Sequence, residues 1–215
     1  FVPYLWMAGI NGRIGIGERV ADVDVGFSDV LDQLNFGFMA AFDARKGKFS
    51  LLTDMLYLKV SDENATPGPL FSSAKVTQKV FILEESAGYR VAEKNGASLD
   101  VTGGIRYWHL NTRLLFTAGL LPDIQVEGSK NWVDAIGGLR GRAPISKSWF
   151  LFGKTDVGGG GSDLTYQFLG GVGAKFRERF SVLFAYRYLH DKYDSDNFLF
   201  DVGIKGPAVG LGIRF

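Results

Sequence analysis

Apolar and polar residues alternate with a period of two along much of this chain, and the alternation restricts the chain to β-structure. It is clearest from Trp6 to Ile16, where Arg13 occupies one of the intervening positions. The pattern recurs at 36–45, 139–143 and 180–188. Successive residues of a strand point to opposite faces, whereas a helix repeats its apolar positions every three to four residues. The pattern therefore predicts strands with one apolar and one charged face.

Short polar turns and longer connections separate these strands in alternation. The compact turns are expected at 46–48, 93–96, 146–148 and 177–179. The longer connections are expected at roughly 17–34, 61–75, 119–133, 158–163 and 191–197. Four turns and five loops require ten antiparallel strands, with both ends of the chain on the side of the short turns. We therefore expect an all-β, antiparallel up-and-down barrel of ten strands, with eight strands as the alternative.

The length and composition fit a single barrel domain over residues 1–215. Gly 29, Phe 18, Tyr 8 and Trp 4 accompany a mean hydropathy of +0.05. Glycine and aromatic enrichment at middling hydropathy is typical of alternating strands. One helix is expected, because Phe27, Val30 and Leu31 repeat at helical spacing behind Ser28, a candidate N-cap. It would be a short amphipathic helix in the first outer loop.

Charge and cysteine content exclude several classes of protein. Lys+Arg 24 against Asp+Glu 23 leaves a formal net charge of +1, so no nucleic-acid partner is expected. The absence of cysteine excludes disulfides and thiolate metal sites. The acids Asp191, Asp194 and Asp196 lack the residue pattern of a calcium loop. We therefore expect no metal and no cofactor.

Aromatic residues are expected to form two belts at the ends of the strands, as they do at the two interfaces of a membrane. The predicted belt residues are Trp6, Phe49, Trp149, Phe180 and Phe215 beside the short turns or termini, and Tyr57, Tyr107, Tyr166 and Tyr188 near the far ends. Lipid around a barrel allows its apolar face to point outward, which a water-soluble barrel cannot do. No uninterrupted apolar run of about 18 residues is present, so a transmembrane helix is not expected.

Charged residues on the opposite face of the strands are predicted to form a polar network in the barrel lumen. Its predicted members are Arg13, Asp43, Asp54, Glu84, Asp100, Arg106, Arg140, Arg142, Lys154, Asp156 and Arg187. Intermixed arginines and carboxylates in a narrow lumen should pair with one another. Glu84 and Glu85 are adjacent, and we place Glu84 inside.

Several segments of the chain are similar to known bacterial outer-membrane barrels. The last strand alternates Val209, Leu211, Ile213 and Phe215 with small or charged residues, which resembles the C-terminal signature read by the barrel-assembly machinery. The segments 23–31, 51–54, 104–108, 132–142 and 186–188 resemble small barrels of the OmpW and OmpA type. The resemblance implies a transmembrane barrel in the bacterial outer membrane with periplasmic termini. It implies no activity and no catalytic residues.

Ten strands with many long side chains inside leave room for a thread of water at most, so a wide porin is excluded. We expect a non-enzymatic barrel that either gives narrow passage to small solutes or hydrophobic compounds or supports the envelope. Its expected partners are outer-membrane lipids, lipopolysaccharide and the barrel-assembly machinery. The alternative is an outer-membrane hydrolase, a protease or lipid-modifying enzyme, with a rim site near His190, one of two histidines in the chain.

Overall fold

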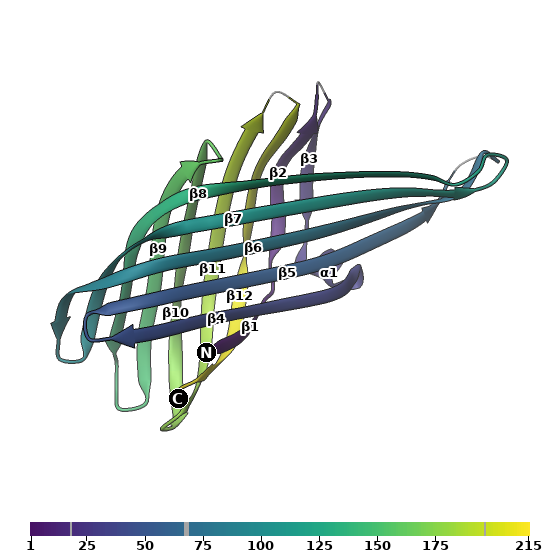
Figure 1. The fold of residues 1–215 in the computed structure, drawn as a ribbon. Coiled ribbons are helices and arrows are strands. Elements are labelled where there is room, and N and C mark those ends of the chain that lie inside the picture. Colours follow the sequence, from purple (N-terminus) through teal and green to yellow (C-terminus); the bar gives the residue numbers. More distant parts are fainter. Residues whose placement is uncertain (18, 67–68, 196) are drawn as a thin grey trace.

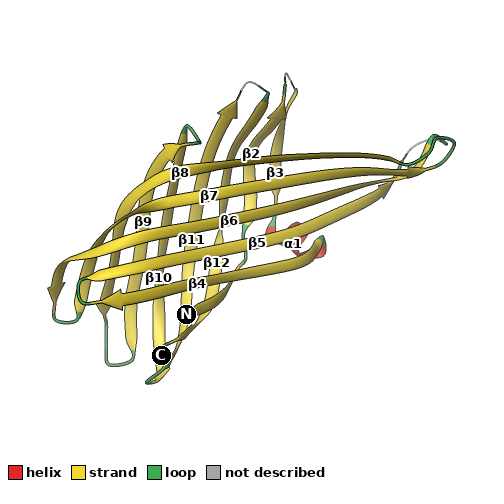
Figure 2. Ribbon diagram, viewed as in Figure 1, coloured by secondary structure: helices red, strands yellow, loops and turns green. Residues whose placement is uncertain are grey.

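The computed structural model describes residues 1–17, 19–66, 69–195 and 197–215, which form one antiparallel sheet and a short helix (Figure 1). The elements are β1 (Val2–Trp6), β2 (Gly9–Ile16), β3 (Arg19–Val25), α1 (Phe27–Asp32), β4 (Leu34–Lys46), β5 (Phe49–Ala65), β6 (Phe71–Lys94), β7 (Ala97–Ala118), β8 (Ile124–Pro144), β9 (Trp149–Gly160), β10 (Leu164–Arg177), β11 (Phe180–Ser195) and β12 (Phe198–Ile213). Figure 2 shows how little of the chain lies outside strands.

The sheet closes into a barrel through β1. Strands β4 to β11 each pair with the next strand along the chain, and β1 lies between β12 and β4. On one side Tyr4 and Trp6 of β1 are the partners of Gly210 and Ala208 in β12. On the other side β1 meets β4 over two residue pairs, at Val2 and Pro3. These ten strands confirm the predicted strand number, and within the described residues β2 and β3 are two further strands outside the closed ring.

The segment 17–34, predicted to be a loop, instead contains β3 and α1. The predicted first strand is interrupted between Trp6 and Gly9, and its second half, β2, forms a hairpin with β3. The helix is present but connects β3 to β4, so its predicted place in an outer loop is wrong. The chain enters the helix at Gly26, whose backbone N–H donates to the Asp29 carboxylate at 3.0 Å. The Glu18 position lies outside the described residues.

Most of the other predicted loops are continuations of strands. β6 and β7 contain 24 and 22 residues, whereas crossing a bilayer requires only about 9–11. Beyond Val60, β5 pairs only with β6, and before Asp134 the ladder of β8 pairs only with β7. We call the four-stranded extension formed by residues 61–65, 71–79, 110–118 and 124–131 the overhang; it projects past the rest of the barrel on the right of Figure 1.

The short turns lie where they were predicted. A two-residue turn joins β4 to β5, and Gly47 adopts the left-handed φ of 61° that such a turn requires. Asn95 and Gly96 form the two-residue turn between β6 and β7, with left-handed φ values of 53° and 79°. Both chain ends lie at this end of the barrel in Figure 1. No helix among the described residues is long and apolar enough to cross a membrane.

Candidate functional site: the barrel interior

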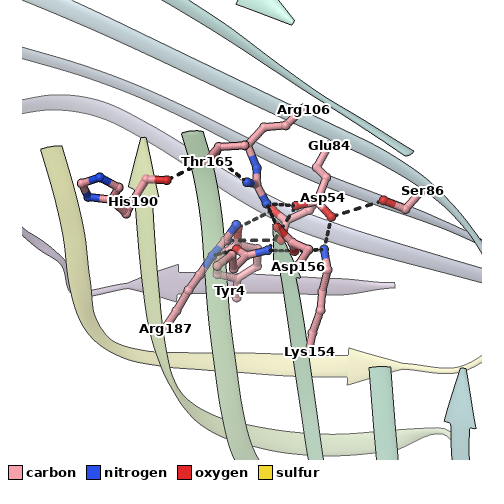
Figure 3. Close-up of polar contacts among 11 residues, drawn as sticks. Tyr4, Asp54, Glu84, Ser86, Arg106, Lys154, Asp156, Thr165, Arg187 and His190 are labelled. Atoms are coloured by element: carbon pink, nitrogen blue, oxygen red, sulfur yellow. Dashed lines mark hydrogen bonds and ion pairs between the residues drawn. The ribbon is translucent and has the colours of Figure 1, made fainter. Parts of the chain in front are cut away.

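Arg106 lies at the centre of a buried ion network between β6, β7 and β9 (Figure 3). Its guanidinium donates to Glu84 at 3.1 Å, to Asp156 at 2.6 Å and to the Thr165 hydroxyl at 2.8 Å. The Lys154 ammonium pairs with both carboxylates. Glu84 is 2% exposed and Arg106 is 0% exposed, so these charges are compensated by one another and not by water.

Arg187 extends this network to the closure of the barrel. It donates to the Tyr4 hydroxyl at 3.0 Å and to Asp54 at 3.2 Å, and Tyr4 itself donates to Asp54 at 2.6 Å. The Arg187 guanidinium also lies 4.7 Å from the centre of the Trp6 ring. Strands β1, β5 and β11 are therefore joined through side chains inside the barrel, at the position where β1 is held to β4 by few backbone pairs.

Nearer the short turns, the remaining predicted network residues form separate pairs. Asp100 accepts from Arg90 at 2.9 Å and from Arg45. Asp43 accepts from Arg140. The Arg142 guanidinium lies 3.7 Å from the centre of the Phe150 ring. All predicted network residues except Arg13 thus point into the barrel.

Arg13 does not belong to this network. It pairs with Asp201 at 3.0 Å, and its side chain is 56% exposed. In β2 and β12 the apolar residues Ile14, Phe200 and Val202 pack into the interior, so their neighbours Arg13 and Asp201 point outward. The prediction that Arg13 faces the lumen is therefore wrong.

A layer of aromatic side chains covers the ion network on the side away from the short turns. The Trp108 and Trp132 rings stack with centroids 5.6 Å apart, and Tyr193 stacks on Trp132 at 4.5 Å. Phe200 contacts both tryptophans, and Phe198 stacks on Phe200. We call these five residues the aromatic layer. Aliphatic residues fill the space around it: Leu56, Ile82, Leu110, Leu189, Val202 and Ile204.

The side chains at the centre of these two levels are shielded from water, although Lys154 and Asp54 of the ion network are 16% and 23% exposed. Arg106, Trp108 and Leu189 are each 0% exposed. Side chains that line an open aqueous channel would be in contact with solvent, so neither level contains such a channel. The sequence reasoning did not identify the aromatic layer. The spacing of the residues could have revealed it, because residues two apart in a strand share a face: Trp108 follows Arg106 by two residues and Trp132 precedes Asp134 by two.

Asp134 and Asp191 are two further buried carboxylates, and both are 0% exposed. Asp134 accepts the Ser162 backbone N–H at 2.6 Å. No hydrogen bond to either carboxylate oxygen of Asp191 is made within the described residues. Asp191 was expected in the connection 191–197, but it lies within β11.

The predicted belt residues point outward, with one exception. Phe49, Trp149 and Phe215 are 67%, 48% and 92% exposed. The others lie on the outer face, with ring contacts such as Tyr166 to Tyr188 and Phe180 to Phe176: they are Tyr57, Tyr107, Tyr166, Phe180 and Tyr188. Trp6 is the exception, since it is 3% exposed and its indole N–H donates to the Gly206 carbonyl at 3.2 Å.

His190, named in the hydrolase alternative, lies on the outer face of β11. Its Nε2 is 3.5 Å from an Asp201 carboxylate oxygen, which belongs to the same outward group as Arg13. Asp196 lies outside the described residues. In the part of the chain that is described, no group of three or more histidine or acidic residues is arranged to hold a metal ion.

Comparison with known proteins supports the fold. No protein-family model and no curated protein matches this sequence. The translocator domain of the autotransporter NalP from Neisseria meningitidis is similar in structure, with a TM-score of 0.50, 15% identity and coverage of 100% of this chain and 88% of that chain. The transport unit of the autotransporter AIDA-I from Escherichia coli gives a TM-score of 0.49 at 12% identity, covering 100% and 90%. The CymD monoaromatic hydrocarbon channel gives 0.30 at 8%, covering 100% and 88%. The likeness to the NalP domain, at 15% identity, concerns the fold alone, and the chain has the fold of an outer-membrane-type β-barrel.

Proposed function

We propose that this protein is a non-enzymatic barrel of the bacterial outer membrane, closed to water and ions at rest, which takes up hydrophobic compounds at its outer mouth. The outward apolar residues and aromatic belts support the membrane location. The position of the short turns supports periplasmic termini. We also propose that the protein is related to OmpW-type barrels and that the barrel-assembly machinery assembles it.

The two sealed levels of the interior argue against passage of hydrated solutes. A small ion would have to displace the Arg106 pairs and then pass Trp108 and Trp132. Breaking a buried ion pair costs about 3–5 kcal/mol, because the remaining partner is left uncompensated. A hydrophobic compound, in contrast, needs only an apolar surface that leads toward the aromatic layer.

The overhang supplies such a surface, and this observation carries the proposal. On its inner face Val76, Leu114 and Val126 are direct cross-strand neighbours, as are Phe116 and Ile124. Val76 is 43% and Val126 is 58% exposed. Along β7 the same face continues through Thr112, which hydrogen-bonds to Gln78, to Leu110 and Trp108, so one polar row separates the exposed apolar residues from the aromatic layer.

The outer face of the overhang is polar. Glu63 pairs with Lys75 at 3.2 Å, and Glu127 pairs with Arg113 at 2.9 Å. The overhang therefore has polar pairs on its outer face and its apolar rows on its inner face, which also carries Gln78 and Thr112. Nearer the short turns the inward face is charged and the outward face is apolar. An exposed apolar surface rimmed by polar residues is typical of a binding site.

The test compares binding of a fluorescent naphthylamine probe by the wild type, Val126→Glu and Gln125→Glu. Gln125 neighbours Val126 on the opposite face of β8, so it is a matched control for the added charge. We expect Val126→Glu to weaken probe binding by about tenfold, because a charge replaces apolar contact, and Gln125→Glu to leave it unchanged. In planar bilayers the wild type should show no discrete ion conductance.

Equal binding by the two variants would exclude the overhang as the site, and a discrete conductance of the wild type would exclude a sealed interior. A wild type that binds no probe would favour a purely supporting role in the envelope. Hydrolysis of a peptide or of lipopolysaccharide that His190→Ala abolishes would favour the enzymatic alternative.

A further inference from the structure

Two lysines lie directly opposite each other on the outer face of the barrel. Lys59 of β5 and Lys79 of β6 are cross-strand partners in the antiparallel ladder. Their neighbours Leu58 and Val80 pack against the interior cluster, so both lysines point outward. Side chains directly opposite on one face are about 5 Å apart at Cβ, and like charges in such a pair repel each other.

No carboxylate of the described residues lies within ion-pair distance of this pair. Neither lysine forms an ion pair there. The acid nearest in the ladder is Glu127, which already accepts from Asn111 and from Arg113, each at 3.0 Å. Lys59, Lys79 and Arg113 supply three positive charges against one negative charge of Glu127, so two positive charges remain on this part of the surface.

The lysine pair lies immediately above the aromatic belt. Tyr57 and Phe81 form the next outward pair along the same two strands. Phe81 lies 6.1 Å from Tyr107, measured between ring centroids. Below this row the outward positions include the apolar Leu83 and Ile105, which is 47% exposed, and also Glu85, the cross-strand partner of Ile105. Aromatic belts lie at the level of the lipid headgroups, so the lysines lie where the phosphates of outer-leaflet lipids are found.

We propose that Lys59 and Lys79 together bind a phosphate of lipopolysaccharide, whose acyl chains lie along the apolar face beneath them. The phosphate between the two ammonium groups removes their repulsion, and lysine binds phosphate as a compact point charge. The location of this site in the outer leaflet rests on the proposed membrane orientation.

The experiment measures thermal unfolding and lipid binding of purified protein in non-ionic detergent, with and without added lipopolysaccharide. The variants are Lys79→Gln and the double variant Lys59→Gln/Lys79→Gln. The control is Lys205→Gln, an exposed lysine of β12 whose cross-strand partners are Tyr188 and Gly9.

Without lipid, Lys79→Gln should unfold at a higher temperature than the wild type, because the repulsion is gone. With lipopolysaccharide the wild type should unfold at a higher temperature than Lys79→Gln. The double variant should bind lipopolysaccharide roughly 25-fold more weakly, from about fivefold for each lysine near a charged lipid surface. Lys205→Gln should follow the wild type in both conditions.

The proposal would be overturned if lipopolysaccharide left the order of unfolding temperatures unchanged. It would also be overturned if Lys205→Gln weakened lipopolysaccharide binding as much as the lysine-pair variants do. Inorganic phosphate is added at the same phosphate concentration, and it should give no stabilisation; an equal effect would show a simple anion site and overturn the lipid assignment. Since the measurement involves neither probe uptake nor conductance, its failure is distinguishable from failure of the proposed function.

Discussion

The Arg106 guanidinium and the Asp156 carboxylate lie 2.6 Å apart inside the barrel, with side-chain exposures of 0% and 1%. Glu84 shares the same guanidinium nitrogen. Arg106 and Lys154 thus together compensate these two carboxylates. Arg106 is the cation of the two that is completely buried, since the Lys154 side chain is 16% exposed.

Replacement of Arg106 by Gln should lower the free energy of unfolding by about 3–5 kcal/mol, because Glu84 and Asp156 lose the buried one of their two shared cations. Urea titration in detergent micelles or lipid vesicles measures this change. The matched control is Arg13→Gln, which removes an exposed ion pair to Asp201 and should cost less than about 1 kcal/mol. Equal effects of the two changes would contradict the buried placement of Arg106.

Tryptophan fluorescence tests which aromatic residues face lipid. The chain has four tryptophans; three are buried inside, and Trp149 is 48% exposed on the outer face. In vesicles of brominated lipid, which quenches fluorescence on contact, the wild type should be partly quenched and Trp149→Phe should not. If Trp6→Phe instead removes the quenching, then Trp6 belongs to the outer belt and its buried position is wrong.

Strand number and turn positions were predictable because period-two patterning and polar turns are local features of the sequence. Interior charges such as Arg106 and Arg187 were predictable as well, since apolar or aromatic residues flank each of them on both sides. Trp6 was not predictable in the same way. Its strand has apolar residues on both faces, with Tyr4 and Trp6 on one and Pro3 and Leu5 on the other, so alternation could not assign it.

The errors at Arg13 and at the overhang share one physical cause. Alternation shows that a strand has two faces, but not which face meets lipid. In β2 and in the overhang the apolar face is the inner one, as in a water-soluble protein, because these segments extend past the belt of Tyr57 and Phe81. The level at which the pattern reverses depends on the register of neighbouring strands, which the sequence alone did not reveal.

The titration of the Glu127 carboxylate tests the ion pair with Arg113 on the outer face of the overhang. Hydrogen bonds from Asn111, and then from Arg113, lower its pKa from 4.5. The pair therefore contributes stability above pH 4.5, and this contribution is lost as the pH falls through the lower pKa of the folded state. In a carbon-13 NMR titration, Arg113→Gln should shift the midpoint of Glu127 upward toward 4.5. Lys75→Gln, which alters the separate pair with Glu63, should leave it unchanged.

A disulfide between β1 and β4 tests how the barrel closes. Val2 and Ala41 are directly opposite in the antiparallel ladder, where Cα atoms are about 4.5–5.5 Å apart, within the range that a disulfide spans. The natural chain contains no cysteine, so an introduced pair has no competing partner. Val2→Cys/Ala41→Cys should cross-link on oxidation and stabilise the protein by up to about 4 kcal/mol, since the bond closes a loop of some 40 residues in the unfolded chain.

Gel migration with and without reductant detects this cross-link. The control is Val2→Cys/Phe42→Cys, because Phe42 is adjacent in sequence but points to the opposite face of β4, where it is 46% exposed. Only the first pair should form the bond. Closure through β1 requires this result, because β1 is the strand that bridges β12 and β4 while β3 pairs with β2 alone. If neither pair cross-links in the folded protein, β1 does not pair with β4 and does not close the ring.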